Sequence, residues 1–270
     1  MRSLTVASTT FRESVRQPVF FTLVVMATLL LIFSYLLPTF TMGIEEVKFL
    51  RDLGLGTYTL CILLLGVFSA ANLITTDIEN FTAMTVMSKP LRRYEFVLGK
   101  FFGIALSVVL LAFLVSVVFF TVTLAKVAGG DIVIRQIAYK AIWPEVGVIL
   151  PGILLGLFQT LLLTAVSVAL STRLPMILNI TISCGLFILA SVSGPFVDYL
   201  KQKDSAAYGI TKVLCYILPS FQSNTEINSA IGLGQTVPGS LVALTVLYSV
   251  FYIAAVLLVA VLLFQDRELG

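Results

Sequence analysis

Six long apolar runs are the feature that most constrains what this chain can fold into. Each run is free of charged residues and histidine, and each can hold the roughly 20 residues that a helix needs to cross the hydrocarbon core of a membrane. The runs lack the period-two alternation of a barrel strand, and a spanning segment must satisfy its own backbone hydrogen bonds, so each predicts a helix. The spans predicted from these runs cover about residues 19–42, 54–75, 98–124, 146–170, 175–197 and 240–264.

Composition supports the same class of protein. Hydrophobic residues make up 59% of the 270 residues, charged residues 11%, and the mean hydropathy is +1.05. The sequence therefore predicts an all-α integral membrane protein that contacts the lipid bilayer, with a single transmembrane domain over residues 1–270. The net charge of +3 is spread over several loops, so no nucleic-acid partner is predicted.

The chemistry missing from the apolar runs excludes several classes of membrane protein. The chain has no histidine, and the runs hold no Asp, Glu, Lys or Arg. A charge at mid-bilayer costs about 3 kcal/mol, so such residues persist mainly where function uses them. Their absence argues against a proton-coupled transporter, an intramembrane protease and a haem-ligating electron carrier. The three cysteines, Cys61, Cys184 and Cys215, have neither metal-ligand nor redox spacing and are predicted to be structural.

Polar residues and glycine pairs within the spans allow two interpretations each. Asn72, Gln159 and Asn179 could line a pathway, but such groups more often bond to a neighbouring helix. Glycines at four-residue spacing permit either close helix approach within the chain or contact in a dimer. The pairs are Gly99 with Gly103 and Gly152 with Gly156.

The residues before the first span predict an amphipathic helix over 3–17, lying in the membrane interface. Leu4, Phe11 and Val15 fall on one helical face, and Pro18 then starts the span. A disordered tail is the alternative. Lys and Arg crowd the N-terminus and the loop at 76–100, which predicts that both termini and this loop are cytoplasmic in a multi-pass protein of the inner (cytoplasmic) membrane.

The longest predicted excursion on the outer side precedes the last span, from Asp198 to about Gly239. It contains the apolar stretch Val213–Phe221, which is too short to span a membrane. A short re-entrant element is therefore expected there, with a packed extracellular cap as the alternative.

The segment Thr76–Gly103 combines charges with a proline between two apolar runs. Acidic residues open a predicted short helix, whose apolar surface continues until Pro90 ends it. From the residues alone, an ordinary positive-inside loop and a docking site are about equally supported. The chain has no phosphate-binding loop, because Phe101 follows its only Gly-Lys pair where Ser or Thr is required, so it is not predicted to be an enzyme with its own nucleotide site.

A family resemblance favours the docking site. Asp77-Ile78-Glu79-Asn80, then Ser88-Lys89-Pro90, Arg93 and Leu98-Gly99-Lys100, resemble the loop between the second and third spans of ABC transporter permeases of the type-2 exporter family. The N-terminal helix, six spans, Leu218-Pro219-Ser220-Phe221 and the charged C-terminal ending are similar to that family over nearly the whole length.

The resemblance implies that this loop is a cytoplasmic coupling helix seated in a separate ATPase. The implied coupling residues are Asp77, Ile78, Glu79, Phe81, Thr82, Met84, Thr85 and Ser88. The implied cytoplasmic anchors are Lys89, Pro90, Arg92, Arg93 and Lys100. It also implies an ABC ATPase dimer that carries the ATP and Mg, and a second permease copy in a homodimer or heterodimer, with no cofactor on this chain.

The predicted function is therefore the membrane subunit of an ATP-driven exporter. A non-transporting scaffold or assembly factor, whose loop docks a soluble partner, is the alternative from another class. A partner without a nucleotide-binding fold would favour that alternative. A third possibility is an energy-independent channel, which would show flux in liposomes that contain this chain alone.

Overall fold

In the computed structural model, every element of the described residues is an α-helix. The structure describes residues 2–36, 44–79, 93–128, 135–202 and 222–265, and within them no strand occurs. The chain is therefore an all-α membrane protein, as its apolar runs predict. The helices are α1 (Arg2–Arg16), α2 (Pro18–Leu36), α3 (Ile44–Glu79), α5 (Arg93–Ala128), α6 (Arg135–Ser171), α7 (Met176–Gln202), α9 (Gln222–Gly232) and α10 (Gly239–Gln265).

Five described helices, α2, α3, α5, α6 and α10, are long and apolar enough to cross a membrane. The predicted span 175–197 falls in α7, whose apolar part Met176–Val192 is shorter, so the count of six spans stays a prediction. The predicted helix at 3–17 forms as α1, while its place in the membrane interface also stays a prediction. The predicted re-entrant stretch Val213–Phe221 lies outside the described residues.

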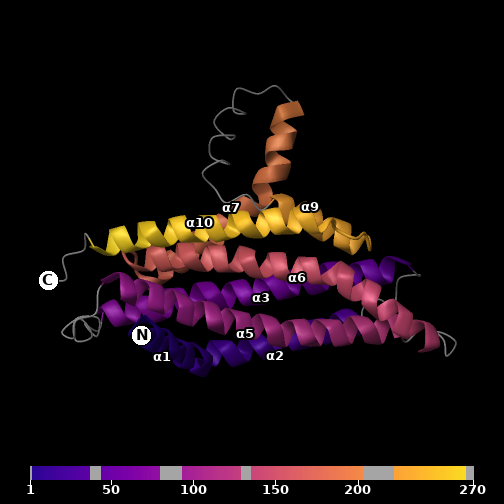
Figure 1. The fold of residues 1–270 in the computed structure, drawn as a ribbon, viewed down its shortest axis with the longest axis horizontal. Coiled ribbons are helices and arrows are strands. Elements are labelled where there is room, and N and C mark those ends of the chain that lie inside the picture. The colour runs from indigo at the N-terminus through magenta and orange to yellow at the C-terminus, as the bar shows by residue number, and fades with distance from the viewer. Residues whose placement is uncertain (1, 37–43, 80–92, 129–134, 203–221, 266–270) are drawn as a thin grey trace.

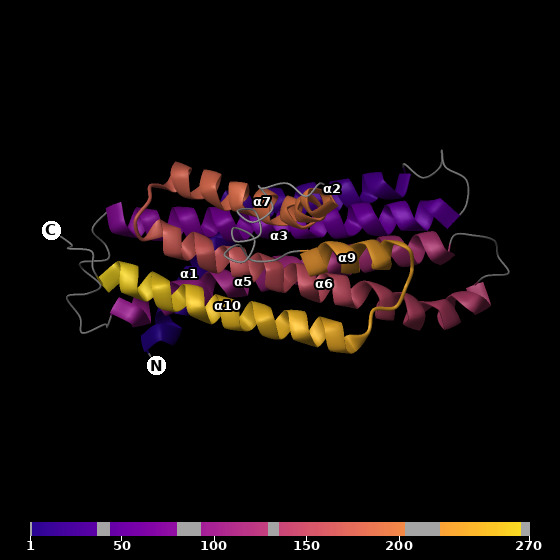
Figure 2. The same cartoon turned by 90° about the horizontal axis from the view of Figure 1, so that it is seen from above.

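The long helices lie side by side, and their ends define two ends of the molecule (Figure 1). At one end lie α1, the C-terminal end of α3 and the first turns of α5; we name it the Lys100 end. Toward the other end lie the beginning of α3, the beginning of α10 and α9; we name it the Arg51 end (Figure 2). The last turns of α7 project away from the other helices (Figure 1).

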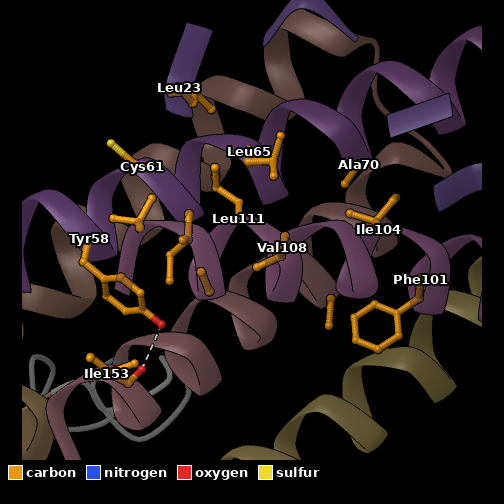
Figure 3. Packing of buried hydrophobic residues seen from close by; sticks show 14 of the residues in the cluster. Leu23, Tyr58, Cys61, Leu65, Ala70, Phe101, Ile104, Val108, Leu111 and Ile153 are labelled. Atoms are coloured by element: carbon orange, nitrogen blue, oxygen red, sulfur yellow. Dashed lines mark hydrogen bonds between the residues drawn. The ribbon is translucent and has the colours of Figure 1, made fainter. Parts of the chain in front are cut away.

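The central helix of the molecule is α3. In its membrane-spanning part 67% of the residues are buried, against 28% for α2 and 17% for α10. The core cluster around α3 includes Tyr58 and Leu65 together with Leu111 of α5 (Figure 3). Large apolar side chains on α2 and α10, such as Phe21 and Phe251, are exposed. Exposed apolar surface on a spanning helix faces lipid at no hydrophobic cost, so α2 and α10 form the periphery of this chain.

The helices α3 and α6 pack along most of their length and run in the same direction. Tyr58 Oη donates a hydrogen bond to the Ile153 carbonyl oxygen at 3.1 Å (Figure 3). Further along both helices, Ser171 Oγ shares its proton between the Ser167 carbonyl oxygen of α6 at 2.7 Å and the Ala70 carbonyl oxygen of α3 at 3.0 Å. Because the contacts advance together along the two sequences, the helices are parallel. The glycine pair of α6 lies in this interface, with Gly152 against Leu55 and Gly156 against Tyr58 and Thr59.

Candidate functional site

A buried cation joins three helices at the Lys100 end. Lys100, on α5, is 5% exposed, and its Nζ lies 2.5 Å from Asp77 Oδ2 near the end of α3. The same Nζ lies 3.8 Å from Glu13 Oε2 on α1. A buried charge is stable only when opposite charges and hydrogen bonds replace its hydration. Two carboxylates around one ammonium meet that requirement, so Lys100 fixes α1, α3 and α5 to one another.

This junction stands at the base of the 80–92 segment, which the structure does not describe. Of the predicted coupling and anchor residues, Asp77 and Lys100 have described side chains, and the structure brings these two together. The helical backbone includes Ile78, Glu79 and Arg93 at the ends of α3 and α5. The other predicted residues lie outside the described part: Phe81, Thr82, Met84, Thr85, Ser88, Lys89, Pro90 and Arg92.

The glycine pair of α5 receives α1. A Cβ at Gly99 would lie 2.8 Å from Val6 Cβ, and one at Gly103 would lie 2.6 Å from the Ala7 carbonyl oxygen. Only a residue without a side chain allows the α1 backbone to approach so closely. Of the two interpretations of this spacing, close approach within the chain is therefore the one that the structure shows.

Three buried serines add a second attachment between the same helices. Ser14 Oγ of α1 donates to Ser107 Oγ of α5 at 2.8 Å, and Ser107 Oγ donates to the Ile104 carbonyl oxygen at 2.7 Å. The Ser14 and Ser69 hydroxyls are 3.1 Å apart, and each hydroxyl has one proton to donate, so Ser69 of α3 is the donor in that pair. The result is a one-directional chain of hydrogen bonds, fully buried, across α3, α1 and α5.

The comparisons with known proteins bear on this arrangement. A family model described as ABC-2 family transporter protein matches residues 4–269, nearly the whole chain. The chain belongs to the ABC-2 family. It is a membrane permease of an ABC transporter. Its apolar helices make it a multi-pass membrane protein. A comparison with curated proteins finds no match.

Asn179 of this ABC-2 permease binds helices together. Its Oδ1 accepts hydrogen bonds from Ser167 and Ser183, and its Nδ2 donates to the Ser167 carbonyl oxygen and to Ser171 Oγ. Two acceptor and two donor positions are the full capacity of an amide side chain. Asn179 is also completely buried, so it holds α7 against α6 and has no capacity left for a transported molecule.

Gln159 and Asn72, the other two polar residues noted in the predicted spans of the permease, differ in burial. Gln159, on α6, is buried. Asn72, on α3, is half-buried, and its Oδ1 accepts a hydrogen bond from Thr76 Oγ1 at 3.2 Å.

Two residues of α1 make contacts at the Lys100 end that the sequence does not predict: Glu13 pairs with Lys100, and Ser14 bonds to Ser69 and Ser107. In the sequence, both residues belong to the predicted amphipathic helix over 3–17, which indicates no partner for either of them. The glycines of the GKFFG motif, Gly99 and Gly103, do predict that a helix packs closely against them, but they do not indicate which helix. The permease uses α1 as that helix.

Proposed function

We propose that this permease is the membrane-spanning subunit of an ATP-driven exporter, and that residues Asp77–Ser88 dock a separate cytoplasmic ATPase. The observation that carries the proposal is the buried Lys100 junction at the base of the segment. A docking segment transmits displacement only if the helices at its two ends are fixed relative to one another. The Asp77–Lys100 ion pair supplies that fixation between α3 and α5.

The helix α3 gives the displacement a path through the molecule. Between Asp77 and Arg51 it rises about 1.5 Å for each residue, a distance of about 39 Å. The hydrogen bonds from Tyr58 and Ser171 tie α6 to α3 along this path. A push on Asp77 would therefore move α3 and α6 as one rigid body.

The proposed complex has two permease copies and two ATPase copies. Its ATP and Mg bind to the ATPase subunits, and both termini of the permease are cytoplasmic in the inner membrane. Family membership supports the ATPase partner, and the basic residues beside the first three spans support the orientation.

Co-purification tests the proposal directly. Pull-down of the full-length permease from its own membranes should bring down an ABC ATPase whose hydrolysis of ATP is inhibited by vanadate. The triple substitution Glu79→Ala, Phe81→Ala and Met84→Ala should reduce both ATPase recovery and hydrolysis, because it removes the predicted docking surface. Leu262→Ala, on an exposed face of α10, is the matched control and should leave both unchanged.

Two outcomes would contradict the coupling role. Retention of the ATPase and of its hydrolysis by the triple variant would show that 77–88 is not the docking segment. Recovery of a partner without nucleotide-binding activity would favour the alternative function, a scaffold whose loop docks a soluble partner, over the exporter subunit.

A further inference from the structure

A second buried ion pair lies at the Arg51 end. Arg51 of α3 is 8% exposed, and its Nη2 lies 2.5 Å from Glu145 Oε1 of α6. Both residues fall outside the predicted spans 54–75 and 146–170. In the structure α3 begins before Arg51 and α6 begins before Glu145, and both side chains are largely buried. Arg51 Nε and Glu145 Oε2 are buried without a hydrogen-bond partner among the described residues. The described side chains of α3 and α6 therefore satisfy the pair only in part.

The C-terminal turn of α9 lies directly on Arg51. The chain leaves α9 through Gly234, whose φ of 75° is in the left-handed region. Gln235 N donates to the Ala230 carbonyl oxygen at 2.9 Å, which closes the helix end in a Schellman turn. A Cβ at Gly234 would lie 2.9 Å from Arg51 Nη1, so no side chain separates the turn from the guanidinium. The carbonyl end of a helix carries partial negative charge, and a cation there is favourable.

The described apolar attachment of α9 is small. Among its described side chains, Ile227 and Ile231 are the buried apolar ones, and Ile231 lies against Gly152 and Leu55 at the α3–α6 interface. Asn228 Oδ1 is buried without a hydrogen-bond partner in the described part of the chain. An element with few buried apolar contacts opens at low free energy. The position of α9 thus depends on the polar contacts of its last turn, where Gly234 lies against Arg51 and Gly232 lies against Asp52.

We propose that Arg51 is a positioning residue that tethers α9 as a movable cover over the Arg51 end of the α3–α6 pair. One guanidinium pairs with Glu145 and supports the C-terminal turn of α9. Loss of its charge releases α9 and admits water to Ile231, while α3 and α6 stay together through Tyr58 and the serines. This role goes beyond ATPase docking, and its test needs neither ATP nor a substrate.

Cysteine accessibility in the full-length chain provides the test. Ile231→Cys is placed in a chain in which Cys61, Cys184 and Cys215 are alanine, reconstituted in lipid nanodiscs. A membrane-impermeant maleimide should label Cys at position 231 slowly when Arg51 is present. Arg51→Met should speed this labelling roughly tenfold, the size expected for losing a partly buried cation at a helix terminus. Arg51→Lys should give an intermediate rate, because it keeps the charge without the planar fork.

Three control variants distinguish the release of α9 alone from a loss of packing throughout the chain. Leu233→Cys, exposed beside the same turn, should label quickly with or without Arg51. Leu111→Cys, fully buried on α5, should stay slow in the Arg51→Met background. Leu262→Ala, exposed near the C-terminal end of α10, should not change labelling at position 231.

Either of two results overturns the proposal. In the first, Arg51→Met leaves the labelling rate at position 231 unchanged. In the second, Arg51→Met accelerates labelling at positions 111 and 231 by the same factor, which would identify Arg51 as a residue of overall stability. Neither result bears on ATPase docking, so the two proposals fail separately.

Discussion

At each end of α3, a buried cation pairs with a carboxylate on a neighbouring helix at 2.5 Å, but the surroundings of the two pairs differ. At the Lys100 end the third element, α1, is also held by the glycine pair of α5 and by the hydrogen-bonded serines. At the Arg51 end the described contacts of the third element, α9, are two buried isoleucines and, at its last turn, the side chains of Arg51 and Asp52. Similar ion pairs thus stand in a firmly packed junction and in a lightly packed one.

The difference teaches that the ion pair alone does not decide rigidity. A buried ion pair contributes little net stability over an apolar replacement, whereas breaking it is costly. At the Lys100 end, the close contact of α1 with α5 and the buried hydroxyl chain add contacts between the helices beyond the ion pair. At the Arg51 end the described apolar attachment of α9 is limited to Ile227 and Ile231, as expected for the movable cover that we propose.

The largest expected effect is at Lys100. Lys100→Met should destabilise the chain by about 3–5 kcal/mol, the usual cost of removing one partner of a buried ion pair. The SDS fraction that unfolds half of the detergent-solubilised chain measures this. Asp77→Asn combined with Lys100→Met should recover most of the loss, because the more buried of the two carboxylates is neutralised as well, while Glu13 is exposed to solvent.

A matched control for this prediction is Lys48→Met, which removes an exposed lysine of α3. It should change stability by less than about 1 kcal/mol, as is usual for exposed charges. Equal stability of the Lys48 and Lys100 variants would show that the Lys100 junction is no stronger than a surface contact.

The next largest effect concerns the contact of α1 with Gly99 and Gly103 of α5. Gly103→Leu would overlap the Ala7 carbonyl oxygen and Thr10, and overpacking of this kind costs about 1–3 kcal/mol. The displaced α1 should be cut by trypsin at Arg12 and Arg16 faster than in the unmodified chain. Gly56→Leu is the control, since a Cβ at Gly56 meets no atom within 4 Å. Equal cleavage rates in the two variants would show that Gly103 is not needed for the close packing of α1 against α5.

A smaller effect is expected from the serine chain. Ser14→Ala leaves the buried Ser69 and Ser107 hydroxyls without their shared neighbour, which should cost about 1–2 kcal/mol. The comparison variant Thr9→Ala removes an exposed hydroxyl that bonds only to its own helix, and it should be nearly neutral. SDS unfolding distinguishes them, and identical curves would mean that the hydroxyl chain adds nothing to the Lys100 end.

The fold class follows from local properties, which is why it could be predicted. The charge-free runs specify their helices because a lipid environment leaves the backbone no other way to bond. Asp77 and Lys100 also stood out, each as a charge beside an apolar run. Their pairing could not be read, because it depends on how α3 and α5 meet across the intervening segment. Likewise, the spacing of Gly99 and Gly103 predicts a close contact without identifying α1 as the helix that makes it.

The Arg51 end was harder to predict for a different reason. The residues of α9, QSNTEINSAIG, are mostly polar, so no apolar periodicity marks them as a helix. Arg51 and Glu145 looked like loop charges because predicted spans begin after them. Only the extension of α3 and α6 beyond the apolar runs brings the two together.

The smallest predicted effect tests whether α3 and α6 form the fixed part of the Arg51 end. Tyr58 lies about two helical turns from Arg51 on α3, and its hydroxyl bonds to α6 at the Ile153 carbonyl oxygen. Tyr58→Phe removes only that bond and should cost about 0.6 kcal/mol, the average for a hydrogen bond between membrane helices. Labelling at position 231 should stay slow in this variant, since Arg51 still holds α9. Faster labelling would mean that α9 follows the α3–α6 interface, and the distinction between a fixed pair and a movable cover would fail.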